Sequence, residues 1–198
     1  MCGIVGYTGK NSAITPLIEG LRRLEYRGYD SAGIALGTSG KLFIEKRAGK
    51  LGNLESSLGD QLPSATSGIG HTRWATHGGP TDNNAHPHVD NDGKLAVIHN
   101  GIIENYNQLK AELQAKGHKF HSDTDTESVA HLLSDLRKEF SGDLPAAMRE
   151  AVKTLRGSFT LLAVHADNPG VIVGVRRNSP LVLGVGDNEF FLASDVAA

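Results

Sequence analysis

Apolar residues near the start of the chain follow first a strand-like and then a helix-like pattern. The run Cys2–Tyr7 is apolar and punctuated by glycines, which is typical of a buried strand. Between residues 12 and 24 the apolar positions recur at helical spacing and line one face. They are Ile14, Leu17, Ile18, Leu21 and Leu24. Pro16 would fall in the first turns of this helix, where its missing N–H costs least.

Two further strands are predicted after this helix. Residues 31–36 and 41–47 are strand-like, and the turn residues Gly37–Gly40 join them. The stretch 49–67 that follows is mixed in character and turn-prone.

The middle of the chain combines two strand candidates with three helices. Residues 69–76 favour a strand that runs into the polar loop 78–84, and residues 95–99 favour a strand that stops at Asn100. Each helix is predicted from a polar N-terminal residue that precedes an apolar stripe. The three starts are Asn105 with Gln108 completing its cap, the capping box Thr124–Glu127, and Asp143, and the third helix runs to Leu155.

The C-terminal part of the chain changes to short strand-like runs. They cover residues 159–166, 171–175, 181–185 and 189–193, and turn residues separate them. Strands that follow one another without a helix are antiparallel neighbours, because a parallel crossover needs about a dozen residues or more. Strands at both ends and helices in the middle predict an α+β fold of layered sheets and helices, in one domain over residues 1–198.

The composition of the chain excludes several classes of function. The chain has 20 Lys and Arg against 22 Asp and Glu, which is not the basic footprint of an electrostatic nucleic-acid binder. No apolar run is long enough to cross a membrane, and no secretory signal pattern opens the sequence. A single cysteine cannot form an internal disulfide. We therefore expect a cytoplasmic protein that binds neither nucleic acid nor a membrane.

The single cysteine is the second residue, which is an unusual position. A thiol attacks only as its thiolate, so it needs a base or a positive neighbour. If Met1 is removed, the α-amino group of Cys2 is such a base, because its ordinary pKa is about 7.7–8.0. Gly3 would let a substrate approach the backbone beside it. A small buried residue without a chemical role is the alternative.

Two later segments place polar side chains where predicted strands end. His71–Gly78 contains the only Trp and an Arg, whose fork is a natural clamp for a carboxylate. The glycines at its end could hinge a lid. His99–Gly101 supplies an Asn amide and a Gly N–H, which are the donors of an oxyanion hole. A surface strand edge and an ordinary Asn-Gly turn are the alternatives for these two segments.

Acidic and histidine-rich segments leave further alternatives open. Ser122–Glu127 has the composition of a helix cap, but one of its carboxylates could receive a substrate ammonium. His77, His86 and His88 invite a zinc site, yet their spacing is poor and the only thiol is remote in sequence. We therefore predict hydrogen-bonding histidines, no metal and no other cofactor.

Five ordered segments together resemble the class II glutamine amidotransferases. They are Met1–Gly6, Leu24–Gly33, His71–Gly78, His99–Asn105 and Ser122–Glu127. The segments LEYRGYDSAG and HTRWATHG narrow the resemblance to the glutaminase domains of glucosamine-6-phosphate synthases. The resemblance extends through essentially the whole chain. It implies the N-terminal-nucleophile fold, a four-layer α-β-β-α sandwich with two mostly antiparallel sheets.

The resemblance also implies the chemistry of glutamine hydrolysis to glutamate and ammonia. Cys2 would attack the side-chain carboxamide of glutamine and form a γ-glutamyl thioester, with its own α-amino group as the proton shuttle. The side chain of Asn100 and the backbone N–H of Gly101 would hold the oxyanion. This chemistry needs no cofactor, because thiolate, amine and two donors cover attack, proton transfer and charge stabilisation.

The same resemblance assigns the binding of the substrate. Arg73 would clamp the α-carboxylate of glutamine and Asp125 its α-ammonium group. Arg27 would support the site near the nucleophile. The loop that closes over glutamine would carry Trp74, Thr76 and His77.

Members of this family also carry sugar-phosphate isomerase domains, which residues 1–198 do not include. We therefore expect a glutaminase domain shortened at its C-terminal end, whose ammonia reaches fructose 6-phosphate only in a full-length enzyme. If Met1 is retained, the α-amine of Cys2 becomes an amide, and the domain would bind glutamine without hydrolysing it. The glutaminase domain of another class II amidotransferase, such as those of purine or asparagine synthesis, is the enzymatic alternative.

Overall fold

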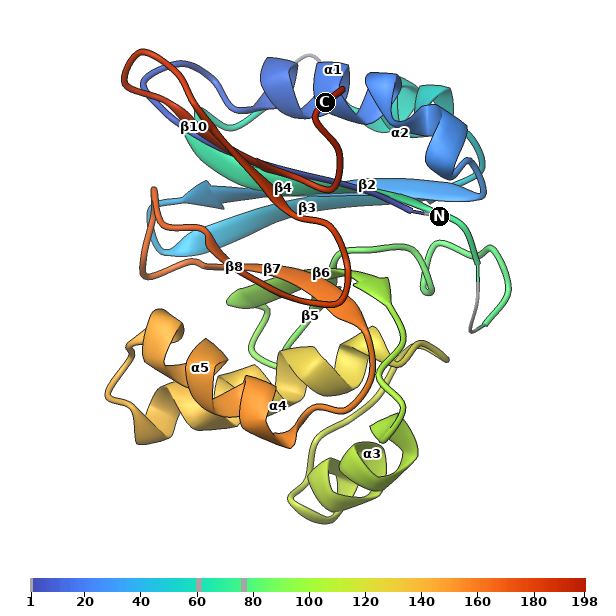
Figure 1. The fold of residues 1–198 in the computed structure, drawn as a ribbon, viewed down its shortest axis with the longest axis vertical. Helices are drawn as coiled ribbons and strands as arrows, with labels where there is room; N and C mark the ends of the chain where they lie inside the picture. The colour runs from blue at the N-terminus through green and yellow to red at the C-terminus, as the bar shows by residue number, and fades with distance from the viewer. Residues whose placement is uncertain (1, 60–61, 76–77) are drawn as a thin grey trace.

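Two antiparallel sheets lie face to face, and helices cover the outer face of each (Figure 1). The computed structural model describes residues 2–59, 62–75 and 78–198. The strand order is β3-β2-β4-β1-β10-β9 in the six-stranded sheet and β5-β6-β7-β8 in the four-stranded sheet. This architecture confirms the expected α-β-β-α sandwich.

The bounds of the strands follow the predicted runs closely. The six-stranded sheet consists of β1 (Gly3–Thr8), β2 (Ser31–Thr38), β3 (Lys41–Ala48), β4 (Ser67–Arg73), β9 (Val182–Val185) and β10 (Phe190–Ala193). The four-stranded sheet consists of β5 (His88–Val89), β6 (Leu95–Gly101), β7 (Phe159–His165) and β8 (Val173–Arg177). Every described pairing between neighbouring strands is antiparallel, as predicted.

The helices divide between the two outer faces. The helices are α1 (Ile14–Arg23), α2 (Leu51–Ser57), α3 (Tyr106–Ala115), α4 (Thr126–Glu139) and α5 (Leu144–Thr154), with a short 3-10 turn at Glu25–Arg27. Figure 1 shows α1 and α2 over the six-stranded sheet, and the other three helices beyond the four-stranded sheet. The predicted stripe of α1 is buried at Leu17, Leu21 and Leu24, and each such side chain contributes about 1.5–3 kcal/mol of burial.

Apolar side chains form three layers because most central strands are buried on both faces. On β6, Leu95 and Val97 pack with the helices of the outer layer, whereas Ala96 and Ile98 pack between the sheets. On β1, Val5 faces the layer of α1, and Ile4 joins Ile98 between the sheets. Successive residues of a strand point to opposite faces, so one apolar run serves two layers.

Three element predictions were wrong or incomplete. The turn-prone stretch 49–67 contains α2, a helix too short to show a full stripe, in which Leu51 and Leu54 are buried. The two-residue strand β5 was not predicted at all. The C-terminal strands are not four successive neighbours, because β7 and β8 pair in one sheet while β9 and β10 pair in the other.

Only one of the three predicted helix caps has the expected hydrogen bond. The carboxylate of Asp143 accepts from the backbone N–H of Ala146 at 2.8 Å. Asn105 precedes α3 but instead joins the end of α5, accepting from the N–H of Arg156 and donating to the carbonyl of Thr154. The helix α4 begins at Thr126, so the box Thr124–Glu127 does not form, and Glu127 binds the segment before it.

Within the described residues, no helix is long and apolar enough to cross a membrane.

Candidate active site

Three strands bring the predicted reactive residues to the same end of the space between the sheets. Ile4, Ile69 and Ile98 all belong to the apolar layer between the sheets. His71 and Asn100 follow Ile69 and Ile98 by two positions, and Cys2 precedes Ile4 by two positions, so alternation points all three side chains toward the same space. The register of β1 and β4 places Ile4 opposite His71, so the polar ends of these strands are adjacent.

These residues border a cavity of about 420 Å³. Its lining includes seven residues predicted from the sequence: Cys2, Arg27, Arg73, Trp74, Asn100, Gly101 and Asp125. The remaining two predicted site residues, Thr76 and His77, lie outside the described part of the chain. A cavity of this size can hold a small polar molecule such as an amino acid.

The Cys2 thiol lies against the backbone of Trp74. The N–H of Trp74 donates to Sγ at 3.2 Å, and Sγ donates to the Trp74 carbonyl at 3.5 Å. Burial raises the pKa of the Cys2 thiol above its ordinary value, although the bond from Trp74 works in the opposite direction. Cys2 is therefore mostly a neutral thiol near pH 7, and attack requires a base.

Gly3 has a different role from the one expected. A Cβ added there would lie 2.6 Å from Oγ1 of Thr72 and 2.8 Å from Cβ of Leu24. Protein atoms already fill the space beside Gly3, so this glycine permits close packing of β1 rather than approach of a substrate.

The segment Asn100–Gly101 ends β6 at the cavity. The Asn100 side chain donates from Nδ2 to the carbonyl of Cys2 at 2.9 Å, so the candidate oxyanion donor and the thiol-bearing residue are bonded directly. Gly101 has a φ of +125°, and a Cβ there would collide with the carbonyl of Ser158. Only glycine fits this backbone position.

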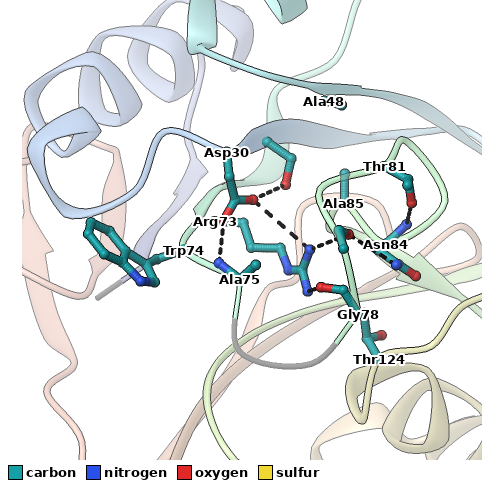
Figure 2. Close-up of polar contacts among 12 residues, drawn as sticks. Asp30, Ala48, Arg73, Trp74, Ala75, Gly78, Thr81, Asn84, Ala85 and Thr124 are labelled. Carbon is teal, nitrogen blue, oxygen red and sulfur yellow. Dashed lines mark hydrogen bonds and ion pairs between the residues drawn. The ribbon is translucent and has the colours of Figure 1, made fainter.

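Arg73 is held in place by a carboxylate and by the backbone of its own loop (Figure 2). Its guanidinium lies 4.0 Å from Oδ1 of Asp30 and donates to the carbonyls of Gly78 and Gly79, at 3.2 Å in each case. The other oxygen of Asp30 accepts from the backbone N–H of Ala75. Figure 2 shows Trp74 pointing away from this network, and its side chain is 48% exposed.

Asp125 approaches the cavity from the start of α4. Its Oδ2 accepts from the backbone N–H of Ile103 at 2.8 Å, which fixes the carboxylate beside the end of β6. Its Oδ1 lies 3.7 Å from Nδ1 of His99. Asp125 is buried, and a buried carboxylate at a cavity wall is suited to a cationic group of a ligand.

Three buried histidines at or near the cavity, His71, His86 and His88, stay neutral. Burial lowers the pKa of His71 and of His88 to about 3, and it lowers that of His86 well below the ordinary value. Oγ1 of Thr126 lies 2.9 Å from Nε2 of His86 and 3.0 Å from Nδ1 of His99. Among the described residues, no group of three or more His, Cys, Asp or Glu side chains is arranged to hold a metal ion.

Arg27 also lines the cavity and connects it to the C-terminal segment. Its Nη1 donates to Oδ2 of Asp195 at 2.6 Å, and the arginine side chain is buried. Gly28 beside it packs on the backbone of Arg73, where a Cβ would lie 2.7 Å from the carbonyl carbon. Arg27 therefore joins segments around the cavity, which suits a supporting role.

Sequence reasoning missed several contributors to the site. Asp30 stands in the quoted motif, but its hold on Arg73 depends on the pairing of β2 with β4. The connection from β8 to β9 crosses from one sheet to the other and lines the cavity with residues 178–180. The turn residues Asn178 and Pro180 indicate a loop at this point of the sequence, but they do not indicate that the loop lies at the cavity.

Comparison with known proteins agrees with this geometry. The profile of the glutamine amidotransferase domain family matches residues 71–198. Over its whole length the chain is 63% identical to a glutamine–fructose-6-phosphate aminotransferase (isomerizing) of Streptomyces coelicolor and 57% identical to that of Corynebacterium glutamicum. The chain spans about a third of each, 32% and 33%.

A solved structure extends the likeness to three dimensions. The glutamine phosphoribosylpyrophosphate amidotransferase from Bacillus subtilis superposes with a TM-score of 0.80 at 28% identity, over 98% of this chain and 42% of that one. The sandwich with a cysteine directly before its first strand is thus an N-terminal-nucleophile fold of the amidotransferase class. The chain belongs to the glutamine amidotransferase domain family, whose role is to release ammonia from glutamine.

Proposed function

We propose that Cys2 hydrolyses glutamine through a γ-glutamyl thioester, and that the released ammonia serves the formation of glucosamine 6-phosphate from fructose 6-phosphate in a longer protein. The observation that carries this proposal is that one cavity is bordered by Cys2, Arg73, Asn100, Gly101 and Asp125. These residues provide a nucleophile, a cation, two donors and an anion in a space suited to an amino acid.

Recognition of glutamine would use both charges of its α-carbon. The α-carboxylate would pair with the guanidinium of Arg73. It would replace the carbonyls of Gly78 and Gly79, to which the guanidinium donates in the structure. The α-ammonium would lie against Asp125. Thr76, His77 and Trp74 would close the loop over the substrate. A site that needs both charges discriminates against simple amides. With such an amide bound, the charged side chains of Arg73 and Asp125 would lack their partners on the ligand.

The first half-reaction forms the thioester. The α-amine of Cys2, free once Met1 has been removed, takes the thiol proton as sulfur attacks the carboxamide carbon. The carbonyl oxygen becomes an oxyanion between the Asn100 amide and the Gly101 N–H. The α-ammonium then returns the proton to the leaving nitrogen, the C–N bond breaks and ammonia departs. The raised pKa of Cys2 supports a need for this base.

The second half-reaction releases glutamate. The α-amine accepts a proton from water as its oxygen attacks the thioester carbon, and the same two donors hold the second oxyanion. The C–S bond then breaks, and the proton restores the thiol. Arg27 would support the nucleophile through its link with Asp195 and would take no part in the chemistry.

The acceptor is proposed from the relatives. Both named relatives are glutamine–fructose-6-phosphate aminotransferases, and this chain aligns with about a third of each. The function implies the cytoplasm as the compartment of the reaction.

Replacement of the nucleophile tests the proposal. We expect the chain without Met1 to release glutamate and ammonia from glutamine, and Cys2→Ala to lose at least about 10⁴-fold in kcat while its thermal unfolding is unchanged. Butyramide, an amide without the two charges, should be hydrolysed far more slowly than glutamine. Turnover of Cys2→Ala near the level of the unchanged chain would refute the assignment.

A further inference from the structure

The amide of Asn100 is fixed at both ends by hydrogen bonds. Its Nδ2 donates to the carbonyl of Cys2 at 2.9 Å, and its Oδ1 lies 3.0 Å from Nε2 of His71. His71 stands on β4, in the opposite sheet from Asn100, so this second bond crosses the space between the sheets. Both side chains are buried.

A backbone carbonyl decides which atom of His71 carries the proton. Nε2 of His71 also lies 2.9 Å from the carbonyl of His99, an oxygen that can only accept. Nε2 must therefore be the N–H of the imidazole. The atom of Asn100 that faces this N–H must accept as well, which makes it Oδ1 and turns Nδ2 toward Cys2. The carbonyl of Cys2 requires the same orientation independently.

The surroundings keep His71 in this one state. It is completely buried, and its ring lies 4.2 Å from the ring of His86, centroid to centroid. Burial lowers the pKa of His71 to about 3, although its hydrogen bonds with Asn100 and with the carbonyl of His99 act in the opposite direction. The imidazole is therefore neutral at working pH, with its proton on Nε2 and a lone pair on Nδ1.

We propose that His71 is a positioning residue of the glutaminase reaction, which holds the Asn100 amide with its N–H groups toward the reacting carbonyl. This inference rests on the proposed function. An amide rotated by half a turn would present Oδ1 to the developing oxyanion and repel it. His71 makes that rotation unfavourable, because Oδ1 would lose its donor and Nδ2 would meet an N–H.

Substitution of His71 separates orientation from binding. We expect His71→Leu to lower kcat about 10- to 100-fold and to change KM for glutamine by less than about twofold. Alkylation of Cys2 by iodoacetamide should keep its rate, because that displacement forms no oxyanion. His71→Gln, whose amide N–H can replace Nε2–H, should restore most of kcat. A rise in KM with unchanged kcat, or no recovery in His71→Gln, would overturn the proposal.

A matched control variant measures the effect of removing a buried histidine that lies away from the site. His165 is buried on β7, and its Nδ1 accepts from the N–H of Asp167. The register of β6 and β7 places it at the opposite end of the sheet from Gly101. His165→Leu should lower the unfolding temperature but leave kcat per folded molecule unchanged. An equal loss of kcat in both variants would mean that His71 acts through stability alone.

A double-mutant cycle identifies the partner. In an Asn100→Ala background the His71→Leu change should cost less than about twofold in kcat, because no amide is left to orient. Full additivity of the two losses would contradict the proposal. A chain that fails to hydrolyse glutamine before any substitution would instead refute the proposed function.

One measurement needs no variant. Nitrogen-15 spectra of the histidine side chains should show His71 protonated at Nε2 and not at Nδ1 from pH 7 down to about pH 5. A proton on Nδ1 in that range would overturn the inference even if His71→Leu did not fold.

Discussion

The two walls of the cavity are built in different ways. The interior wall consists of Asn100, Gly101 and Asp125, which regular structure positions and buried partners hold. The loop wall consists of Arg73–Ala75 with Gly78 and Gly79, which follow the end of β4. On the interior wall the bonds run to other elements. On the loop wall Arg73 bonds to the carbonyls of its own loop, which a substrate carboxylate could replace.

This difference indicates how the site divides its work. Stabilisation of a developing charge requires donors that are fixed before the reaction, and the interior wall supplies them. Capture of a substrate requires a wall that exchanges its internal bonds for bonds to the ligand, and the loop wall has such bonds. We infer that Asn100 and Gly101 of the interior wall set kcat, whereas affinity is set by the loop wall together with the fixed carboxylate of Asp125.

The comparison is tested by substitutions that keep the charge on each wall. Asp125→Glu displaces a packed carboxylate by about one carbon–carbon bond, and we expect it to lower kcat/KM about 10²- to 10³-fold. Arg73→Lys keeps the cation but loses the fork, and we expect a loss of about 10- to 100-fold, mostly in KM. Steady-state kinetics with glutamine measure both losses. A larger effect of Arg73→Lys, expressed in kcat, would reverse the roles of the walls.

A smaller effect follows from His71, His86 and His88, the buried histidines at or near the cavity. His71 and His88 have a pKa of about 3 in the folded chain, below the ordinary value of 6.5, and His86 is lowered too. Below about pH 6.5 the unfolded chain therefore binds more protons than the folded chain. The free energy of unfolding consequently decreases as the pH is lowered. The loss approaches about 1.4 kcal/mol per histidine per pH unit, and it continues toward pH 3.

Urea unfolding at pH 7.5, 6.5 and 5.5 measures this slope. Glu127 contributes to the slope only in stronger acid, because its pKa is about 2. Burial tends to raise this pKa, but hydrogen bonds with His131, Ser122 and His121 lower it by more. Its contribution is present above about pH 4.5 and is lost as the pH falls toward 2. His71→Gln should remove about a quarter to a third of the slope between pH 6.5 and 5.5, because burial also lowers the pKa of His165. A stability that is constant over this range would show that these histidines titrate normally.

The parts of the site carried by regular strands were predictable from the sequence. Cys2 begins the apolar run of β1, whereas Arg73 and Asn100 stand where the runs of β4 and β6 end, and the structure places all three at one cavity. Alternation along β1, β4 and β6 points Cys2, His71 and Asn100 into the space between the sheets. The four-layer fold followed from the resemblance rather than from periodicity alone.

The remaining contacts depend on how distant segments pack against one another, which no local sequence pattern predicts. The bond from His71 to Asn100 requires the two sheets to face each other in one particular offset. The cap at Asn105 was wrong because its side chain binds the backbone at the end of α5, and the box at Thr124–Glu127 was wrong because Glu127 accepts from the N–H groups of His121 and Ser122 instead. The lining by residues 178–180 follows from a connection between sheets, which strand spacing alone does not predict.

The central claim is that Cys2 is the nucleophile of a glutamine site, and intact mass tests it most directly. The chain is weighed before and after exposure to 6-diazo-5-oxo-L-norleucine, a glutamine-shaped electrophile, with excess glutamine as competitor. The account predicts a chain without Met1 that gains one adduct on Cys2, and glutamine should slow the labelling. A chain that lacks Met1 and gains no adduct, or one that is labelled at the same rate with glutamine present, would contradict it.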